Sequence, residues 1–175
     1  MTAGASIVFS SFTSAADPMP RAWSRFRDQL ISAEPRHEGH TDSDLDEPRS
    51  GPVCVWRLLA SNNRELGRSA VLYRTFLDAR AAVFDARLAA SEFEIRSVHG
   101  PNAGTHGWFA LDDDGSPLIT CGRWYGAHAA SIEAAQHSIE AFQGATVLAE
   151  GHRRLSPDRR RSIREAAPTP APATP

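Results

Sequence analysis

The chain has 175 residues, a formal net charge of −2 and a hydrophobic share of 41%. This length fits one domain with flanking tails, and the near-neutral charge singles out no class of partner. Two cysteines are too few for a disulfide scaffold, and no stretch approaches the roughly 18 apolar residues that span a membrane. Together with the lack of a basic, apolar leader, these features predict a soluble cytoplasmic protein without membrane contact.

Residues 1–51 are predicted to form an N-terminal tail that contains one short helix and an acidic linker. Residues 1–20 are mostly small and polar, and we expect them to be mobile. The stretch 21–31 predicts an amphipathic helix that docks on the domain or on a partner. Its apolar face consists of Trp23, Phe26, Leu30 and Ile31. Residues 34–50 carry a net charge of −4 and two prolines, which predicts a disordered linker.

Residues 52–148 are predicted to fold, and they contain an internal repeat. Residues 56–73 align with residues 108–125 at a constant spacing of 52. The repeat signature consists of Trp56, Asn62, Ser69 and Tyr73 in the first copy and of Trp108, Gly115, Cys121 and Tyr125 in the second. Asn-Asn and Asp-Gly stand at the matched turns, and both pairs tolerate the positive φ of two-residue hairpins. Each copy therefore predicts a strand, a tight turn, a second strand and a helix.

The two predicted helices carry apolar stripes at helical spacing. The first stripe consists of Phe76, Leu77, Val83, Phe84 and Leu88, and the second of Ile132, Ala135, Ile139 and Phe142. The stripes match best at a spacing of 56, so the second copy gains one helical turn. Gly144 suits the end of the second helix. The alternating residues 93–98 predict a further strand before the second copy.

The signature resembles the YegP-like family of small bacterial domains of unknown function, which often occur as tandem copies. The first copy carries the likeness through Trp56, Leu58, Asn62, Ser69 and Tyr73, followed by Ala82 and Val83 in an Ala-rich helix. The resemblance implies an α+β fold in which two strand–strand–helix repeats share one antiparallel sheet. It also implies that the helices pack on one face and are exchanged between the repeats. The composition of the segments on either side predicts disordered tails. Asn63 stands where the family favours Gly, and the family contributes no catalytic residue or cofactor.

Two patterns raise the question of a metal site. Asp112–Asp114 are three consecutive acids, but a calcium loop that starts at Asp112 would place Pro117 at position six and Arg123 at position twelve. The first copy has no carboxylate at this place, which favours a hairpin turn. His37 and His40 lie in the linker, where a defined metal geometry is not expected. We therefore predict no metal ion and no cofactor.

Histidines outside the linker and one cysteine are candidate catalytic groups. His99 and His106 flank a Gly-rich loop, where they either meet or stay solvated. His128 lies near the apolar stripe and is expected to be half-buried. Cys121 and His128 would make a nucleophile–base pair, but no third, orienting group and no oxyanion hole accompany them. The sequence therefore predicts no catalytic residue.

Arginines supply the remaining candidate contacts. Arg80 and Arg87 lie seven residues apart on the first helix, where they either cover the edge of the core or line a groove for an anion or an acidic partner. Residues 149–175 form an Arg-rich segment with a Pro/Ala/Thr tail, which suits a phosphate backbone, a solvated helix or contact with the acidic linker. Its possible anion or nucleic-acid contacts are Arg153, Arg154, Arg159, Arg160, Arg161 and Arg164.

The leading functional hypothesis is a non-catalytic module, monomeric or homodimeric, that binds a protein partner or a small ligand. The first alternative is a nucleic-acid-associated accessory protein that uses the Arg-rich segment. The second alternative is an enzyme with an unrecognised site.

Overall fold

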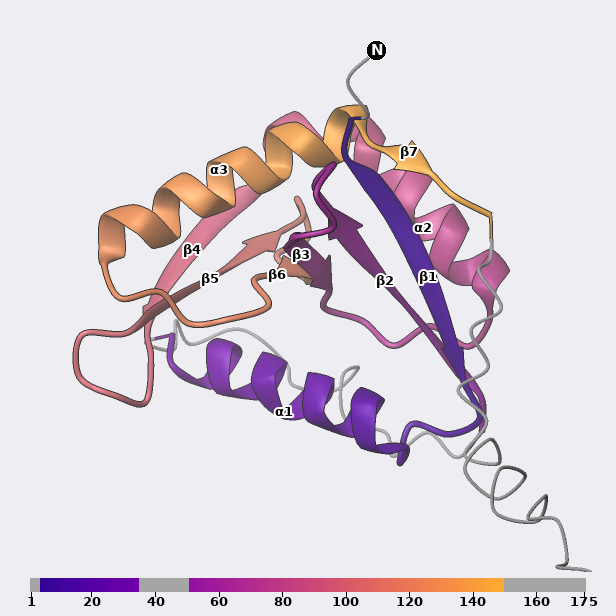
Figure 1. Cartoon of the computed structure of the whole chain (residues 1–175), viewed down its shortest axis with the longest axis horizontal. Coiled ribbons are helices and arrows are strands. Elements are labelled where there is room, and N and C mark those ends of the chain that lie inside the picture. Colours follow the sequence, from indigo (N-terminus) through magenta and orange to yellow (C-terminus); the bar gives the residue numbers. More distant parts are fainter. Residues whose placement is uncertain (1–3, 35–50, 150–175) are drawn as a thin grey trace, which may run out of the picture.

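Seven strands form one sheet in the computed structural model, which describes residues 4–34 and 51–149. The strands are β1 (Ser6–Phe12), β2 (Val53–Leu59), β3 (Glu65–Ser69), β4 (Glu94–His99), β5 (His106–Leu111), β6 (Pro117–Thr120) and β7 (Thr146–Val147). Their order across the sheet is β4-β5-β6-β3-β2-β1-β7 (Figure 1). All neighbouring pairs are antiparallel except β1 and β7, which are parallel. The predicted α+β class with one shared sheet is confirmed.

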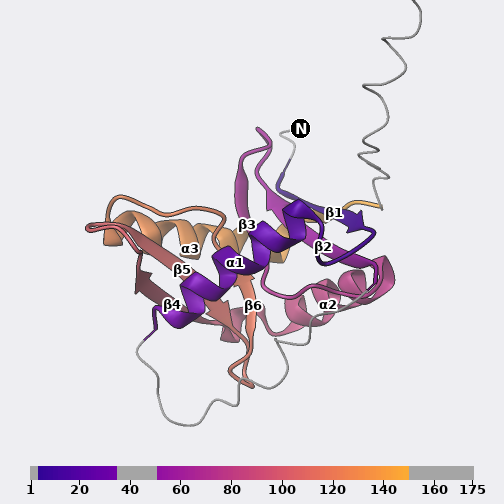
Figure 2. The ribbon, with the colours of Figure 1, turned by 90° about the horizontal axis from the view of Figure 1, so that it is seen from below.

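Helices cover both faces of this sheet. They are α1 (Pro18–Ser32), α2 (Phe76–Leu88) and α3 (His128–Gly144), and a 3-10 turn (Ala90–Glu92) follows α2. The two predicted repeat helices, α2 and α3, share one face as expected, and α1 crosses the opposite face (Figures 1 and 2). α2 packs over β1 and β2, while α3 packs over β3, β4 and β5. Each repeat helix thus lies mainly on its own half. α3 also reaches the first half, where Ser138 donates a hydrogen bond to the oxygen of Leu66 and the ring centre of Phe142 lies 5.5 Å from that of Trp56.

The prediction of a mobile stretch at residues 1–20 is wrong for Ser6–Phe12, which form β1. This strand pairs with β2 along its whole length, from Ser6↔Leu59 to Phe12↔Val53. Ile7 and Phe9 are buried in the core. Only three consecutive apolar residues mark β1 in the sequence, and its partner strand begins far along the chain, so local periodicity did not reveal it. The folded body therefore includes β1 and α1 rather than starting at residue 52.

α1 docks on the sheet of its own domain, which is one of the two outcomes expected for the amphipathic helix; the other was docking on a partner. Trp23 and Leu30 are buried, and the indole Nε1 of Trp23 donates a hydrogen bond to the backbone oxygen of Ser69 at 2.8 Å. Gly107 of β5 permits the close approach, because a Cβ at this position would lie 2.4 Å from Cδ2 of Leu30. The helix is longer than predicted because a proline in the first turn, where no backbone N–H is needed, lets it begin at Pro18.

The two halves of the sheet are related by a local two-fold arrangement. The sequence spacing of 52 places Arg68 on Thr120, and these two residues are Cα partners where β3 pairs with β6. The isolated bridges Cys54↔Tyr73 and His106↔Tyr125 obey the same spacing. By this relation β1 corresponds to β4, because each pairs antiparallel with the first signature strand of its half. Each half therefore contains three strands and a helix. The third strand of the second half, β4, was predicted at residues 93–98, whereas that of the first half, β1, was not.

The two hairpin turns have the same geometry. Asn63 has a φ of 61° and Gly115 a φ of 76°, so both occupy the left-handed region. The N–H of Asn63 donates to the oxygen of Ala60 at 2.9 Å, and the N–H of Gly115 donates to the oxygen of Asp112 at 3.0 Å. Turns at Asn-Asn and Asp-Gly are confirmed, but they are not two-residue turns. Only the second residue of each pair has a positive φ. The N–H of Ala60 donates to the oxygen of Arg64, and the N–H of Asp112 donates to the oxygen of Ser116, so each loop has three residues.

The second repeat helix is one turn longer than the first, as predicted, but the predicted spacing of 56 does not relate the two helices. The buried Ala79 and Val83 of α2 correspond to the buried Ser131 and Ala135 of α3 at a spacing of 52. α2 has 13 residues and α3 has 17. The residues that precede the helices, Thr75 and Ala127, keep the spacing of 52, so the additional turn lies at the C-terminal end of α3. That end carries Phe142 to the core under β2, where Trp56 lies.

No helix in the described part of the chain is long and apolar enough to cross a membrane.

Because β1 is part of the core, replacing Phe9 with Ala should lower the free energy of unfolding by about 3–5 kcal/mol. Phe9 is 3% exposed and packs edge-on against Phe76 at 4.9 Å. Denaturant titration followed by circular dichroism measures the change. The matched control is Met19→Ala, at a position that is 47% exposed, which should change stability by less than about 0.5 kcal/mol. Equal, small effects of the two substitutions would contradict the placement of β1.

The positive φ at Gly115 predicts that Gly115→Ala lowers the free energy of unfolding by about 1 kcal/mol, since a Cβ is strained in the left-handed region. Gly126→Ala is the control, because Gly126 has an ordinary φ and nothing within 4 Å of an added Cβ. Thermal unfolding of the two variants should separate them. A neutral Gly115→Ala would show that the turn relaxes without cost.

Candidate functional site

The repeat signature residues stabilise the two halves. The backbone N–H of Trp56 donates to Oγ of Ser69 at 3.3 Å. In the other half the N–H of Trp108 donates to Sγ of Cys121 at 3.4 Å. Tyr73 and Tyr125 form the equivalent backbone bridges, and the side chain of Asn62 accepts from the N–H of Arg64 at 3.1 Å. Ser and Cys are thus interchangeable here because both accept the same backbone hydrogen bond.

The acids at Asp112–Asp114 belong to a turn. Oδ1 of Asp112 accepts from the N–H of Ser116 at 2.7 Å, while Asp113 and Asp114 are exposed. Among the described residues, no three His, Cys, Asp or Glu side chains are arranged to hold a metal ion. The turn interpretation agrees with this geometry.

Three histidines meet at one end of the sheet, although the sequence favoured solvated loop histidines. The ring centre of His106 lies 5.0 Å from that of His99 and 5.5 Å from that of His128. The hairpin register explains the first contact, since His99 and His106 are Cα partners at the ends of β4 and β5. His128 joins them because α3 begins beside the bridge between His106 and Tyr125.

The pKa of His106 is lowered from its ordinary value. Desolvation is the main cause, and the neighbouring His99 and His128 lower it further. Nδ1 of His106 is buried and has no hydrogen-bond partner in the structure. A protonated ring at this position would be poorly solvated and would face two further imidazoles. The cluster therefore favours a neutral His106, which does not by itself constitute a catalytic arrangement.

Cys121 does not form the nucleophile–base pair weighed from the sequence. The side chain is fully buried, and burial raises the pKa of its thiol to about 11. Its sulfur accepts the hydrogen bond from Trp108, while the ring of His128 contacts His106 instead. A thiol that stays protonated at neutral pH is a weak nucleophile.

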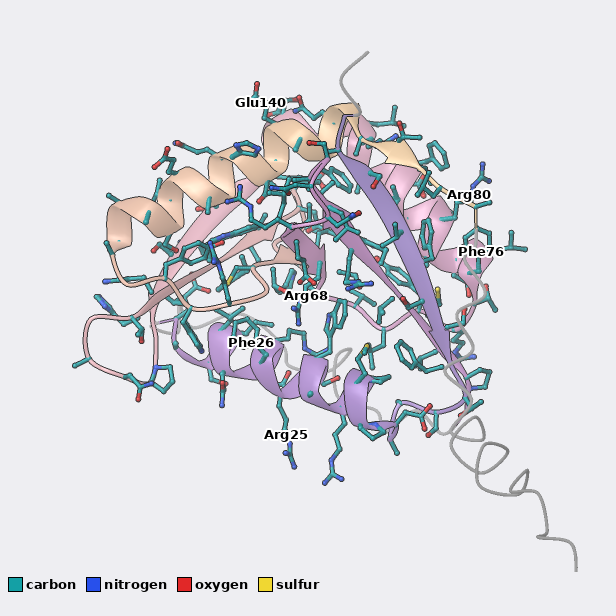
Figure 3. All side chains as sticks on the ribbon, viewed as in Figure 1. Arg25, Phe26, Arg68, Phe76, Arg80 and Glu140 are labelled. Atoms are coloured by element: carbon teal, nitrogen blue, oxygen red, sulfur yellow. The ribbon has the colours of Figure 1, made fainter. Side chains whose placement is uncertain are left out.

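An arginine that sequence reasoning did not single out lies between the sheet and α1. The guanidinium of Arg68 lies 4.3 Å from the ring centre of Trp23 and 5.9 Å from that of Phe26. Its Nε pairs with Oε1 of Glu65 at 2.6 Å, and Nη2 donates to the oxygen of Gly122 at 3.3 Å. Figure 3 shows Arg68 pointing from the sheet toward α1. These contacts use the guanidinium to attach α1, so Arg68 is structural.

Arg80 and Arg87, the candidate anion ligands on α2, have different roles. Arg87 donates to the backbone oxygens of Phe142 and Ala145 at the end of α3, and burial lowers its pKa. Arg87 therefore satisfies carbonyl groups at a helix C-terminus. Arg80 is exposed, points away from the sheet and lies 4.9 Å from the ring centre of Phe84 (Figure 3).

α2 presents an apolar surface to solvent, which corrects the expectation that the five apolar residues predicted for this helix form one buried face. Val83 is buried and Phe76 is partly buried. Leu77, Phe84 and Leu88 are instead 69%, 41% and 88% exposed. The sequence contains two apolar faces on this helix, and only one of them can meet the sheet. In the second half the stripe is inward as expected, with Ala135 and Phe142 buried.

The remaining predicted contacts lie outside the described residues. They are His37 and His40 in the linker, and Arg153, Arg154, Arg159, Arg160, Arg161 and Arg164 in the C-terminal segment. Nucleic-acid binding through these arginines stays a prediction from the sequence.

Comparisons with known proteins give one likeness. No family model matches the sequence, and no curated protein matches it. The structure is similar to the solution NMR structure of a protein of unknown function, yegP from E. coli, with a TM-score of 0.44 and 14% sequence identity. The similarity covers 54% of this chain and 80% of that chain. That protein carries the name of the family that the signature resembles. Because that protein is of unknown function, any function of this chain must be argued from its own residues.

The histidine cluster predicts that His106 titrates below the ordinary histidine pKa of about 6.5. The unfolded chain then binds more protons than the folded one, so the free energy of unfolding falls as pH drops below about 6.5 toward the folded-state pKa. His99→Gln removes one of the neighbouring imidazoles and should raise the pKa of His106. NMR titration of the ring nitrogens measures the pKa of His106 in the native chain and in the variant. His137→Gln, on the exposed face of α3, is the control, and a His106 that titrates at or above 6.5 in the native chain would contradict the assignment.

Proposed function

We propose that this protein is a cytoplasmic, non-catalytic interaction module built from two tandem copies of one unit, and that it binds a protein partner through α2. The contact surface is the α2 stripe, defined as Leu77, Ala81, Phe84 and Leu88. All four residues are exposed, and they recur at helical spacing along one side of the helix. This exposed stripe on a helix whose other side already packs on the sheet is the observation that carries the proposal.

The energetics of apolar surface support a binding role for the α2 stripe. Burial of a Leu or Phe side chain contributes about 1.5–3 kcal/mol, and folding leaves most of that contribution unused at Leu77 and Leu88. Single exposed apolar residues are ordinary on protein surfaces, but three that share one helical face form a contiguous patch. The guanidinium of Arg80 beside Phe84 adds a charged rim, as is common at protein interfaces.

The chemistry of the described candidate groups supports the non-catalytic part of the proposal. The Cys121 thiol is buried and its pKa is raised to about 11, so it is protonated at neutral pH. Arg87 donates to backbone carbonyls, and Arg68 is paired with Glu65. Their polar groups serve the packing of helices on the sheet rather than converging on a shared substrate position.

Site-specific photo-crosslinking in the cell of origin tests the α2 stripe. A benzophenone side chain at Leu88 of the full chain should crosslink to protein, and the product should disappear when Leu77→Asp is added. The matched control places the same group at Met19, an exposed apolar residue on α1 at the opposite face. Crosslinking at Leu88 that does not exceed the Met19 control, or that persists after Leu77→Asp, would refute binding through this surface.

A further inference from the structure

The exposed face of α2 has the spacing of a coiled-coil seam. Leu77, Ala81, Phe84 and Leu88 alternate by four, three and four residues, which assigns Leu77 and Phe84 to d positions and Ala81 and Leu88 to a positions. The seam spans nearly the whole of α2. A second helix laid along it would meet large side chains at three layers and a small one at Ala81, where the two backbones can approach closely.

Charged residues flank this seam in a sorted pattern. The e positions hold Asp78 and Asp85, and the g positions hold Arg80 and Arg87. Asp78, Asp85 and Arg80 are exposed. Arg87 is engaged with the carbonyls of α3, so the charges available to a partner are mainly Arg80 and Asp85. One side of the seam is acidic and the other is basic.

This sorting is self-complementary for one orientation only. In a parallel, in-register pair, a g residue faces the e residue five positions further along the partner helix, so each Arg80 meets an Asp85. In an antiparallel pair, e faces e and g faces g, which would oppose acids to acids and arginines to arginines. A second copy of this chain therefore supplies the complementary charges when its α2 runs parallel.

We propose that the α2 stripe binds the α2 stripe of a second copy of the chain, in parallel and in register. This inference rests on the proposed function and names its partner. The two-fold axis would run along the helices, with Leu77, Ala81, Phe84 and Leu88 each meeting their own equivalents, as in other isologous interfaces. The sheets then lie on the outer sides of the helix pair. Because the seam has only four layers, the dimer is weak and depends on concentration.

Charge exchange tests the pairing of Arg80 with Asp85. Sedimentation velocity over a concentration series should show a monomer–dimer equilibrium for the full chain. Arg80→Asp alone and Asp85→Arg alone should each lower the association constant about tenfold or more, because like charges then face each other. The double variant Arg80→Asp/Asp85→Arg should regain the native association constant, and an equimolar mixture of the two single variants should form a heterodimer.

Disulfide trapping tests the orientation. Both native cysteines are buried, so Leu88→Cys introduces an exposed thiol. In the parallel pair this thiol meets its own equivalent, and mild oxidation should give a covalent dimer. An antiparallel pair would instead crosslink Leu88→Cys with Leu77→Cys only when the two variants are mixed. Met19→Cys, on the opposite face, is the control and should give no more dimer than random collision.

The outcomes separate this inference from the proposed function. A chain that stays monomeric at all concentrations, or a double charge variant that fails to regain association, overturns the homodimer. If the Leu88 photo-crosslink then joins a different protein and is lost with Leu77→Asp, the α2 stripe is still an interaction surface, and only the identity of the partner is wrong. If the crosslink also fails, both proposals fall.

Discussion

The pairing of β3 with β6 is the constraint on which the rest of the molecule depends, because it joins the two halves of the sheet. Few ladder positions make up this junction. Helices from both faces reinforce it through backbone carbonyls of β3 and its end: Trp23 and Arg27 of α1 donate to Ser69 and Ala70, and Ser138 of α3 donates to Leu66. Hydrogen bonds from helices on both faces of the sheet thus reinforce the short central ladder.

Local patterns in the sequence predicted a large part of this fold. Turn chemistry located both hairpins because positive φ restricts the residues at Asn63 and Gly115, and helical periodicity located the three helices. The strand at Ser6–Phe12 was not predicted, since its burial depends on a partner distant in the chain. The meeting of His99, His106 and His128 likewise depends on hairpin register and on where α3 begins, neither of which is encoded in histidine spacing.

The candidate surface on α2 was visible in the sequence but was assigned to the core. Phe76 and Val83 lie one position before Leu77 and Phe84, so the two pairs differ by about 100° around the helix. A sheet can bury only one such face, and both faces are apolar here. The sequence contained a signal for the difference, namely the acids and arginines that flank the outer stripe, because a charged border on both sides is typical of a helix seam rather than of a core face.

The segments that join equivalent strands cover different amounts of apolar surface in the two halves. Residues 100–105 make a short turn between β4 and β5, whereas the segment from β1 to β2 includes α1, which reaches across to Gly107 of β5. An insertion in the N-terminal half thus shields apolar surface that belongs to the C-terminal half. The halves are therefore no longer equivalent as folding units: the C-terminal half, released on its own, would expose Trp124 and the face beneath α1 to water. The C-terminal half thus depends on α1 of the N-terminal half to keep this face away from water.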